Sequence, residues 1–255
     1  MATDVLRVED RERVRTLTFH RPEAANAFNE TLYLAVADAL ELAADDDGVS
    51  VVLLTGSGRT FTAGTDLKEM ADLARAHASG ETAGDAGKGF TTLMDALVEF
   101  PKPLMAAVNG AGVGLGLTML THCDLVLLAE DARLLAPFTT MGVAPEAASS
   151  YLLPQRIGRQ RAALALLTGR WITADEAVTA GLALRTCPPD ALLETAHELA
   201  REIAAKPLPS LLATKRLMRD AHRDAVRQAM EREAAAFAEL LRNAAAADNV
   251  LARLD

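Results

Sequence analysis

Short apolar runs recur along the first half of the chain, and segments with helical spacing lie between them. Residues 5–8 and 14–19 alternate apolar with polar or charged residues, which is typical of strands with one exposed face. Three later runs, residues 51–55, 104–108 and 125–128, are apolar or β-branched throughout. Strands that are buried on both faces lose the alternation. These runs therefore predict an α/β fold with a mainly parallel sheet covered by helices on both sides.

Helical spacing dominates the chain after residue 149. An earlier helix is predicted from the candidate N-cap Asn29 to residue 42. Thr173 and Glu176 have the spacing of a capping box. The segment 72–89 is rich in small and charged residues, and we expect a surface helix–loop region there. The alanine-rich block 234–247 keeps a helical period. Further helices are predicted over residues 149–157, 190–205, 210–220 and 223–242.

A glycine-rich stretch between residues 103 and 124 has the order of a buried strand, a tight turn and a buried helix. Glycines occupy alternate positions after the strand: Gly110, Gly112, Gly114 and Gly116. Glycine lets the backbone lie close to a ligand, and a helix start presents free N–H groups at the positive end of its dipole. The stretch therefore suits an anion, or an oxygen that becomes anionic during a reaction. The alternative is a structural role, in which the glycines only allow close packing.

A second glycine turn, residues 61–70, follows the predicted strand 51–55 and leads into a helix. The carboxyl ends of parallel strands meet at one edge of a sheet. Two such turns can each offer a backbone N–H to one substrate oxygen, and this requires the right backbone path rather than a special side chain. The pair of turns is therefore a candidate site.

The composition argues against several classes of partner. The 255 residues suffice for one large domain, or for one domain with a helical appendage. The net charge of −9 argues against a nucleic acid as the main partner, since phosphate binding needs a basic surface. The apolar stretch 104–120 is too short and glycine-broken to span a membrane. Leu115 stands where a dinucleotide fingerprint has its third glycine.

Metal ligation and thiol chemistry are also not expected. The two cysteines and five histidines have no ligand spacing, so we predict no metal site. His122 and Cys123 are adjacent but lack an acid partner in the pattern, and we interpret them as helix and core residues. The first residues do not contain a basic segment followed by an apolar core. We therefore expect no signal peptide and a cytoplasmic protein.

Several segments, taken in order, resemble the crotonase superfamily of enoyl-CoA hydratases and isomerases. They are Arg21-Pro22 with Asn26-Ala27, residues 61–70, Ala107-Val108-Asn109-Gly110, Cys123-Asp124 and Gly142 to Glu146. The likeness runs from about residue 14 to residue 219. It implies a crotonase-like spiral of ββα units over residues 1–200 and a helical C-terminal trimerisation region over residues 201–255. It also implies a homotrimer or a dimer of trimers, and an acyl-CoA thioester as substrate. We expect no separate cofactor, because coenzyme A is part of that substrate.

The resemblance also implies roles for individual residues. The N–H groups of Thr65 and Leu115 would form an oxyanion hole that holds the thioester oxygen. Contacts with coenzyme A are implied at Ala25, Ala63, Asp66 and Leu67. Four basic residues are candidates for the CoA phosphates, with a solvated basic helix face as the alternative for each: Lys68, Lys215, Arg216 and Arg219.

The departures from the family pattern concern the carboxylates. A hydratase of this family uses two glutamates, but Thr118 and Phe138 stand at those positions. Addition of water needs both a base and an acid, so their absence counts against hydratase activity. Glu146 lies instead in a P-E-x-x-S-S pattern that resembles the delta-3, delta-2 enoyl-CoA isomerase branch, where this glutamate is the catalytic base.

One carboxylate suffices to move a double bond from a 3-enoyl to a 2-enoyl thioester. Apolar neighbours of Glu146, namely Val143, Ala144 and Ala147, would desolvate it and raise its pKa. Without the resemblance, Glu146 would be interpreted as a glutamate near a helix start. We therefore expect an enoyl-CoA isomerase. A hydratase, hydrolase or decarboxylase on the same scaffold, and a non-catalytic acyl-CoA-binding protein, remain alternatives.

Overall fold

The computed structural model of the chain describes residues 4–72 and 87–241. Its larger sheet has six strands in the order β1-β2-β3-β5-β7-β10. β1 and β2 are antiparallel, and the remaining neighbours pair in parallel, as the apolar runs predicted. The strands are β1 (Leu6–Arg11), β2 (Val14–Phe19), β3 (Val51–Gly56), β5 (Leu104–Val108), β7 (Leu125–Ala129) and β10 (Arg185–Cys187).

A second sheet of four short strands has the order β4-β6-β8-β9. Its members are β4 (Thr60–Thr62), β6 (Ala111–Val113), β8 (Arg133–Leu135) and β9 (Trp171–Thr173). The strand pairs β3–β4, β5–β6 and β7–β8 each place one strand in the larger sheet and the next in the smaller sheet. This repeated crossing agrees with the ββα spiral that the resemblance implied.

The prediction for the glycine-rich stretch was wrong in part. Residues 111–113 form β6 rather than a turn, and the segment that follows is not one helix. It consists of the four-residue helix α4 (Leu115–Thr118) and a 3₁₀ helix, η2 (Met119–His122). A strand of three residues shows no measurable period, so the hydrophobic pattern could not reveal it.

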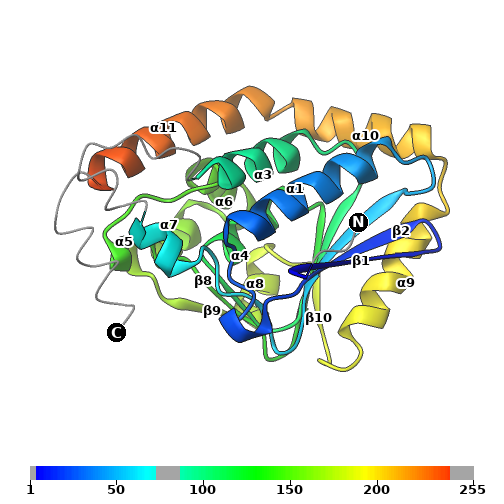
Figure 1. Cartoon of the computed structure of the whole chain (residues 1–255), viewed down its shortest axis with the longest axis horizontal. Helices are drawn as coiled ribbons and strands as arrows, with labels where there is room; N and C mark the ends of the chain where they lie inside the picture. Colours follow the sequence, from blue (N-terminus) through cyan, green and yellow to red (C-terminus); the bar gives the residue numbers. More distant parts are fainter. Residues whose placement is uncertain (1–3, 73–86, 242–255) are drawn as a thin grey trace.

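Helices cover both faces of the larger sheet. Every residue of β3 and β5 is buried. Helices α1 (Glu30–Asp45) and α3 (Lys88–Glu99) lie side by side, while α9 (Leu192–Ala204) packs against β2, β3, β5 and β7 (Figure 1). The Asn29 side chain accepts a hydrogen bond from the Leu32 N–H, so the predicted N-cap is confirmed. α9 buries residues at intervals of four: Leu192, Ala196, Ala200 and Ala204.

The C-terminal half is mostly helical, as predicted. Its elements are α5 (Phe138–Met141), α6 (Ser149–Ile157), α7 (Arg159–Thr168), α8 (Ala174–Ala180), α10 (Leu208–Asp220) and α11 (Arg223–Leu241). The capping box at the start of α8 is confirmed. Figure 1 shows α10 and α11 along one side of the molecule, with α11 beside α3 and α6. Whether residues 1–200 and 201–255 are separate units stays a prediction.

Two predicted segments fall wholly or partly outside the described residues. Most of the helix–loop region 72–89 lies there, although Lys88 and Gly89 begin α3. The alanine-rich block is helical as far as residue 241. In the part of the chain that the structure describes, no helix is long and apolar enough to cross a membrane.

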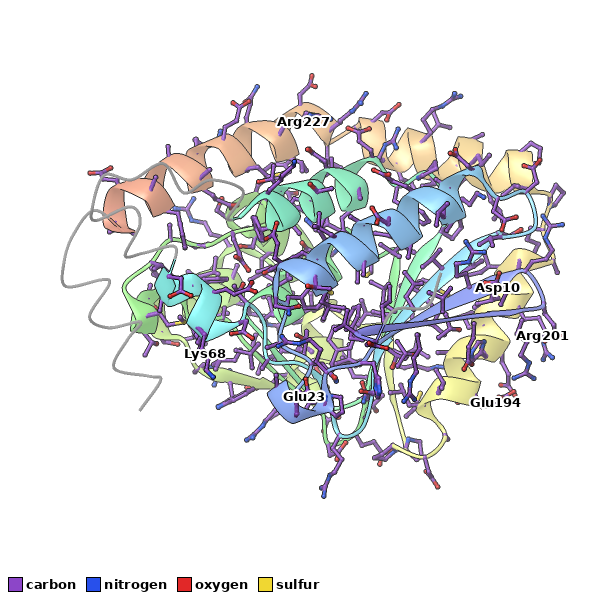
Figure 2. The ribbon with its side chains drawn as sticks, in the orientation of Figure 1. Asp10, Glu23, Lys68, Glu194, Arg201 and Arg227 are labelled. Carbon is purple, nitrogen blue, oxygen red and sulfur yellow. The ribbon has the colours of Figure 1, made fainter. Side chains whose placement is uncertain are left out.

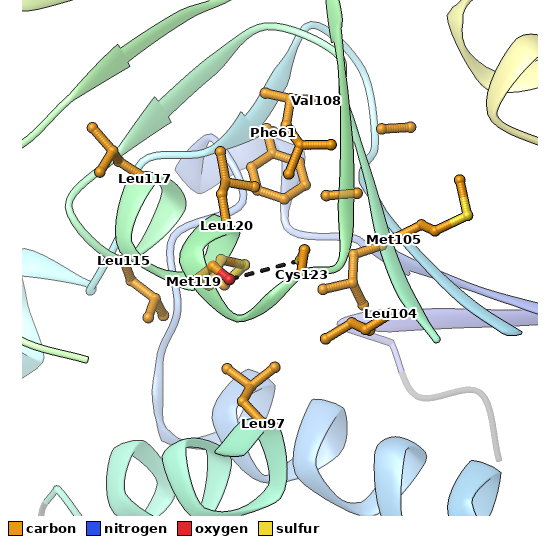
Figure 3. Packing of buried hydrophobic residues seen from close by; sticks show 14 of the residues in the cluster. Phe61, Leu97, Leu104, Met105, Val108, Leu115, Leu117, Met119, Leu120 and Cys123 are labelled. Atoms are coloured by element: carbon orange, nitrogen blue, oxygen red, sulfur yellow. Dashed lines mark hydrogen bonds between the residues drawn. The ribbon is translucent and has the colours of Figure 1, made fainter. Parts of the chain in front are cut away.

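The core fixes the backbone around α4. Figure 3 shows Leu97 of α3 below the segment 115–123, and Leu104 and Met105 of β5 to its right. Within that segment the apolar side chains are buried: Leu115, Leu117, Met119, Leu120 and Cys123. Protein interiors are close-packed, so this segment cannot shift without disturbing the core. The start of α4 is therefore held in one position.

Candidate active site

The turns that follow β4 and β6 meet at the edge of the smaller sheet. β4 pairs with β6 in parallel, with Thr62 opposite Gly112. Gly64 has a φ of +87°, and a Cβ there would lie 2.5 Å from the Val113 carbonyl oxygen and 3.6 Å from the Leu115 nitrogen. Only glycine tolerates both this φ and this closeness. The structure therefore brings the turn that carries Thr65 against the start of α4, where Leu115 lies.

The N–H groups of Thr65 and Leu115 donate no hydrogen bond within the described part of the chain. Phe28 is hydrogen-bonded to the residues on both sides of Thr65. Its N–H donates to the Gly64 carbonyl, and its carbonyl accepts from the Asp66 N–H. Leu115 is the first residue of α4, where an N–H has no partner in the helix. Two unpaired backbone donors on adjacent turns can bind one oxygen atom of a ligand.

Tyr33 contacts the turn that carries Thr65. The Tyr33 hydroxyl is hydrogen-bonded to the Thr65 Oγ1 at 2.7 Å, and the side chain is 3% exposed. Burial raises the pKa of Tyr33 well above its ordinary value, and the negative charge of Glu146 raises it further. The sequence analysis did not single out Tyr33.

Glu146 lies in the segment between α5 and α6. Its neighbours Val143, Ala144 and Ala147 are buried. Burial raises the pKa of Glu146 to about 8, and the charge of Glu233 contributes to the shift. The predicted direction of this pKa shift is confirmed. A carboxyl group with a pKa near neutrality can both remove and return a proton at physiological pH.

The candidate CoA-contacting residues gather beside the Thr65 turn. The Ala63 N–H donates to the Ala25 carbonyl at 3.0 Å. Asp66 accepts from the Arg21 guanidinium at 3.1 Å and from the Lys68 N–H at 3.0 Å. Leu67 directly follows Asp66 and is partly buried. The structure thus brings Ala25, Ala63, Asp66 and Leu67 together, and their contact with coenzyme A stays a prediction.

The candidate phosphate-binding residues differ in their surroundings. Lys68, labelled in Figure 2, is exposed, and Arg216 is exposed on α10. Arg219 pairs with Asp220 and donates to the Glu99 carbonyl. Lys215 is 8% exposed, and its ammonium donates to Asp124 at 2.6 Å. Asp124 also accepts the Leu104 N–H at 2.7 Å, so this ion pair joins α10 to β5.

Lys215→Met is expected to lower the free energy of unfolding by about 2 kcal/mol, because Asp124 loses its countercharge in a largely buried place. Methionine keeps most of the apolar stem. For a chain of this size the melting temperature should fall by roughly 5 °C, as differential scanning calorimetry can measure. Arg216→Met, on the exposed side of the same helix, is the control and should change little. An unchanged melting temperature together with a raised KM for an acyl-CoA would instead indicate phosphate binding by Lys215.

Other candidates from the sequence are inert in this structure. Burial lowers the pKa of His122 to about 4, and its Nε2 donates to the Ala147 carbonyl at 2.8 Å. Burial raises the pKa of the Cys123 thiol to about 12. Cys123 lies in the core, as predicted, whereas His122 is only partly buried. Among the described residues, no cluster of histidine, cysteine or acidic side chains could hold a metal ion.

The comparisons with known proteins agree on one family. The family model described as "Enoyl-CoA hydratase/isomerase" matches residues 9–252. A 2,3-dehydroadipyl-CoA hydratase of Escherichia coli (strain K12) is 36% identical over 230 residues, which are 90% of this chain and 88% of the relative. An enoyl-CoA delta isomerase 2 of Rattus norvegicus is 33% identical over 223 residues, covering 86% of this chain and 56% of that protein.

Comparison with solved structures points to the same family. The crystal structure of an enoyl-CoA hydratase/isomerase from Pseudoalteromonas atlantica T6c superposes with a TM-score of 0.90 at 40% sequence identity, covering 98% of this chain and 96% of the other. The family model spans most of the chain, and a close relative is matched along most of its length. The chain therefore belongs to the enoyl-CoA hydratase/isomerase family of the crotonase superfamily.

Proposed function

We propose that the chain isomerises 3-enoyl-CoA thioesters to 2-enoyl-CoA thioesters, with Glu146 as the one catalytic base. The observation that carries this proposal is the pair of unpaired backbone N–H donors, Thr65 and Leu115, which lie on adjacent turns. Glu146 adds a carboxyl group whose pKa burial raises to about 8, and its charge acts on Tyr33, whose hydroxyl is hydrogen-bonded to the Thr65 side chain.

The reaction begins when the Glu146 carboxylate removes a proton from C2 of the substrate. The electron pair moves onto the thioester oxygen, and the resulting dienolate oxygen accepts hydrogen bonds from the Thr65 and Leu115 N–H groups. Glu146, now protonated, returns the proton to C4. The double bond has then moved from C3–C4 to C2–C3, and Glu146 is again a carboxylate. These donors stabilise the intermediate more than the substrate, because the oxygen carries full negative charge only in the intermediate.

Hydration is the second candidate, since a relative of 36% identity is named as a hydratase. The positions of the two hydratase glutamates hold Thr118 and Phe138, whose side chains are buried. The Thr118 Oγ1 finds no hydrogen-bond partner in the described part of the chain. Neither residue can act as a general base, so nothing at these positions activates water.

A homotrimer or dimer of trimers remains our proposal for the assembly. Helix α10 exposes Leu217 by 73% and Met218 by 61%, and a subunit interface would cover such side chains. Cytoplasmic placement likewise stays an expectation.

The experiment that tests the function offers the protein two substrates in parallel. Conversion of 3-hexenoyl-CoA is followed by the ultraviolet absorbance of the conjugated 2-enoyl thioester. Hydration of a 2-enoyl-CoA is followed by the loss of the same absorbance. Turnover of the 3-enoyl thioester with little hydration supports the proposal. Hydration at a comparable kcat/KM would reject it, and binding without turnover of either substrate would indicate a binding protein.

The rate of isomerisation should increase with pH. Glu146 acts as a base only when ionised, and its raised pKa keeps it mostly protonated at neutral pH. We therefore expect kcat/KM to rise about tenfold per pH unit at low pH and to level off above about 8. Initial rates between roughly pH 5.5 and 9.5 at constant ionic strength measure this rise of kcat/KM with pH, the ascending limb of the pH profile. A plateau that already begins near the ordinary glutamate pKa would contradict a desolvated base.

A further inference from the structure

A buried carboxylate from α11 holds the turn that follows Glu146. Glu233 is 6% exposed. Its Oε2 accepts the Ala148 N–H at 2.7 Å, and its Oε1 accepts the Ser150 N–H at 2.8 Å. Ala148 is the N-cap of α6 and has no side chain that could cap the helix. Glu233 therefore supplies the cap from a residue far along the chain, and its charge suits the positive end of the α6 dipole.

The backbone that Glu233 holds is strained. Ala147 and Ala148 have φ values of 59° and 55°, in the left-handed region that residues with a Cβ rarely occupy. Such a conformation persists only where surrounding contacts enforce it. His122 contributes one of these contacts by donating to the Ala147 carbonyl at 2.8 Å. Glu233 contributes two more, and all three lie within four residues of Glu146.

We propose that Glu233 is a positioning residue for catalysis: by holding the Ala148 and Ser150 N–H groups it fixes the turn that aims Glu146 at the substrate. The inference rests on the proposed function, because it assumes that Glu146 is the base. Glu233 acts through the backbone and does not itself touch the reacting atoms.

The charge of Glu233 has a second effect on Glu146. Two carboxylates that lie close together disfavour ionisation, so Glu233 helps to raise the pKa of Glu146. The other titratable groups around this pair are Tyr33 from α1, His122 from η2 and Arg232 from α11. Burial keeps the pKa of Tyr33 well above its ordinary value and lowers the pKa of His122 to about 4, so both are neutral near pH 7. Burial raises the pKa of Glu233, and the hydrogen bonds from Ser150 and Ala148 and the charge of Arg232 oppose that shift. Loss of the Glu233 charge should therefore lower the pKa of Glu146.

Three variants of α11 separate these effects. Glu233→Gln removes the charge and replaces one acceptor by an NH₂ group that faces a backbone N–H. Glu233→Asp keeps the charge, but its side chain is one methylene shorter, so the carboxylate lies farther from the Ala148 and Ser150 N–H groups. Glu231→Gln changes an exposed glutamate of the same helix and is the control. Isomerase kinetics are measured for each across the pH range, with circular dichroism and thermal melting to establish that each variant is folded.

We expect Glu233→Gln to lower kcat at its pH plateau about tenfold with little change in KM, since a misplaced base slows the chemical step. Its ascending pH limb should move to lower pH by roughly half a unit to one unit. Glu233→Asp should also lower kcat but leave the limb in place, and Glu231→Gln should match the wild type. A role in stability alone would lower the melting temperature without moving the limb.

The inference is overturned if folded Glu233→Gln and Glu233→Asp keep the wild-type kcat and pH limb while Glu146→Gln is inactive. That result would leave the proposed function intact. If Glu146→Gln retains full isomerase activity, both proposals fall, because no base remains to be positioned.

Discussion

Glu146→Gln is expected to lower kcat for isomerisation of a 3-enoyl-CoA by about 1,000-fold or more. Glutamine has nearly the same shape, but its amide cannot accept the proton from C2. Binding of an acyl-CoA, measured by isothermal titration calorimetry, should change by no more than about threefold, since the ground-state contacts remain. Loss of turnover with binding retained separates a catalytic role from a structural one. Activity within about tenfold of the wild type would remove Glu146 from its role as base.

The same substitution should make the protein more stable at alkaline pH. The pKa of Glu146 is raised from 4.5 to about 8 on folding, so the unfolded chain ionises this group first. The folded state therefore binds more protons between these pH values, and stability falls as the pH rises through the window. Glutamine avoids that penalty. Because the wild-type side chain is partly exposed, we expect a gain of about 2 kcal/mol at pH 8 and almost none near pH 4.5. Melting curves at the two pH values test this, and an equal shift at both would exclude the titration of Glu146 as its cause.

The larger sheet followed from the hydrophobic pattern because its strands are long enough to show one. β2 and β5 matched their predicted bounds, and β1 overlaps the predicted strand 5–8. Local hydrogen-bond chemistry was also predictable: the Asn29 cap and the box of Thr173 with Glu176 depend on neighbours within one helical turn. The smaller sheet was missed because strands of three residues, such as β6, carry too few positions for a period.

Some residues of the candidate site could likewise be predicted from the sequence, and others could not. The turns that carry Thr65 and Leu115 could be found because glycines mark them in the sequence. Tyr33 and Glu233 could not be found, since each acts across a long separation: Tyr33 contacts Thr65, and Glu233 contacts Ala148 and Ser150. Glu233 has helical spacing with the apolar residues Val226, Ala229 and Met230, unlike the exposed Glu231, but the local sequence does not show which backbone groups it contacts. Such partners are set by how helices pack, and that information lies in the tertiary structure.

Gly64→Ala is expected to lower kcat/KM for isomerisation by roughly 100- to 1,000-fold, as the loss of one oxyanion donor does. The added methyl group would lie 2.5 Å from the Val113 carbonyl oxygen, which belongs to the backbone and cannot rotate away. The turn must therefore move, and the Thr65 N–H moves with it relative to the Leu115 N–H. Ground-state binding of an acyl-CoA should weaken only a few-fold, because these donors act mainly on the charged intermediate.

Gly58→Ala is the matched control for this prediction. Gly58 also has a positive φ, +72°, so alanine meets similar backbone strain there. A Cβ at position 58, however, has no atom within 4 Å and lies in the turn between β3 and β4. Gly58→Ala should therefore lose about 1 kcal/mol of stability while keeping its kcat/KM. If folded Gly64→Ala is as active as Gly58→Ala, the Thr65 and Leu115 N–H groups do not form the oxyanion hole. The alternative in which the glycines only allow close packing would then hold.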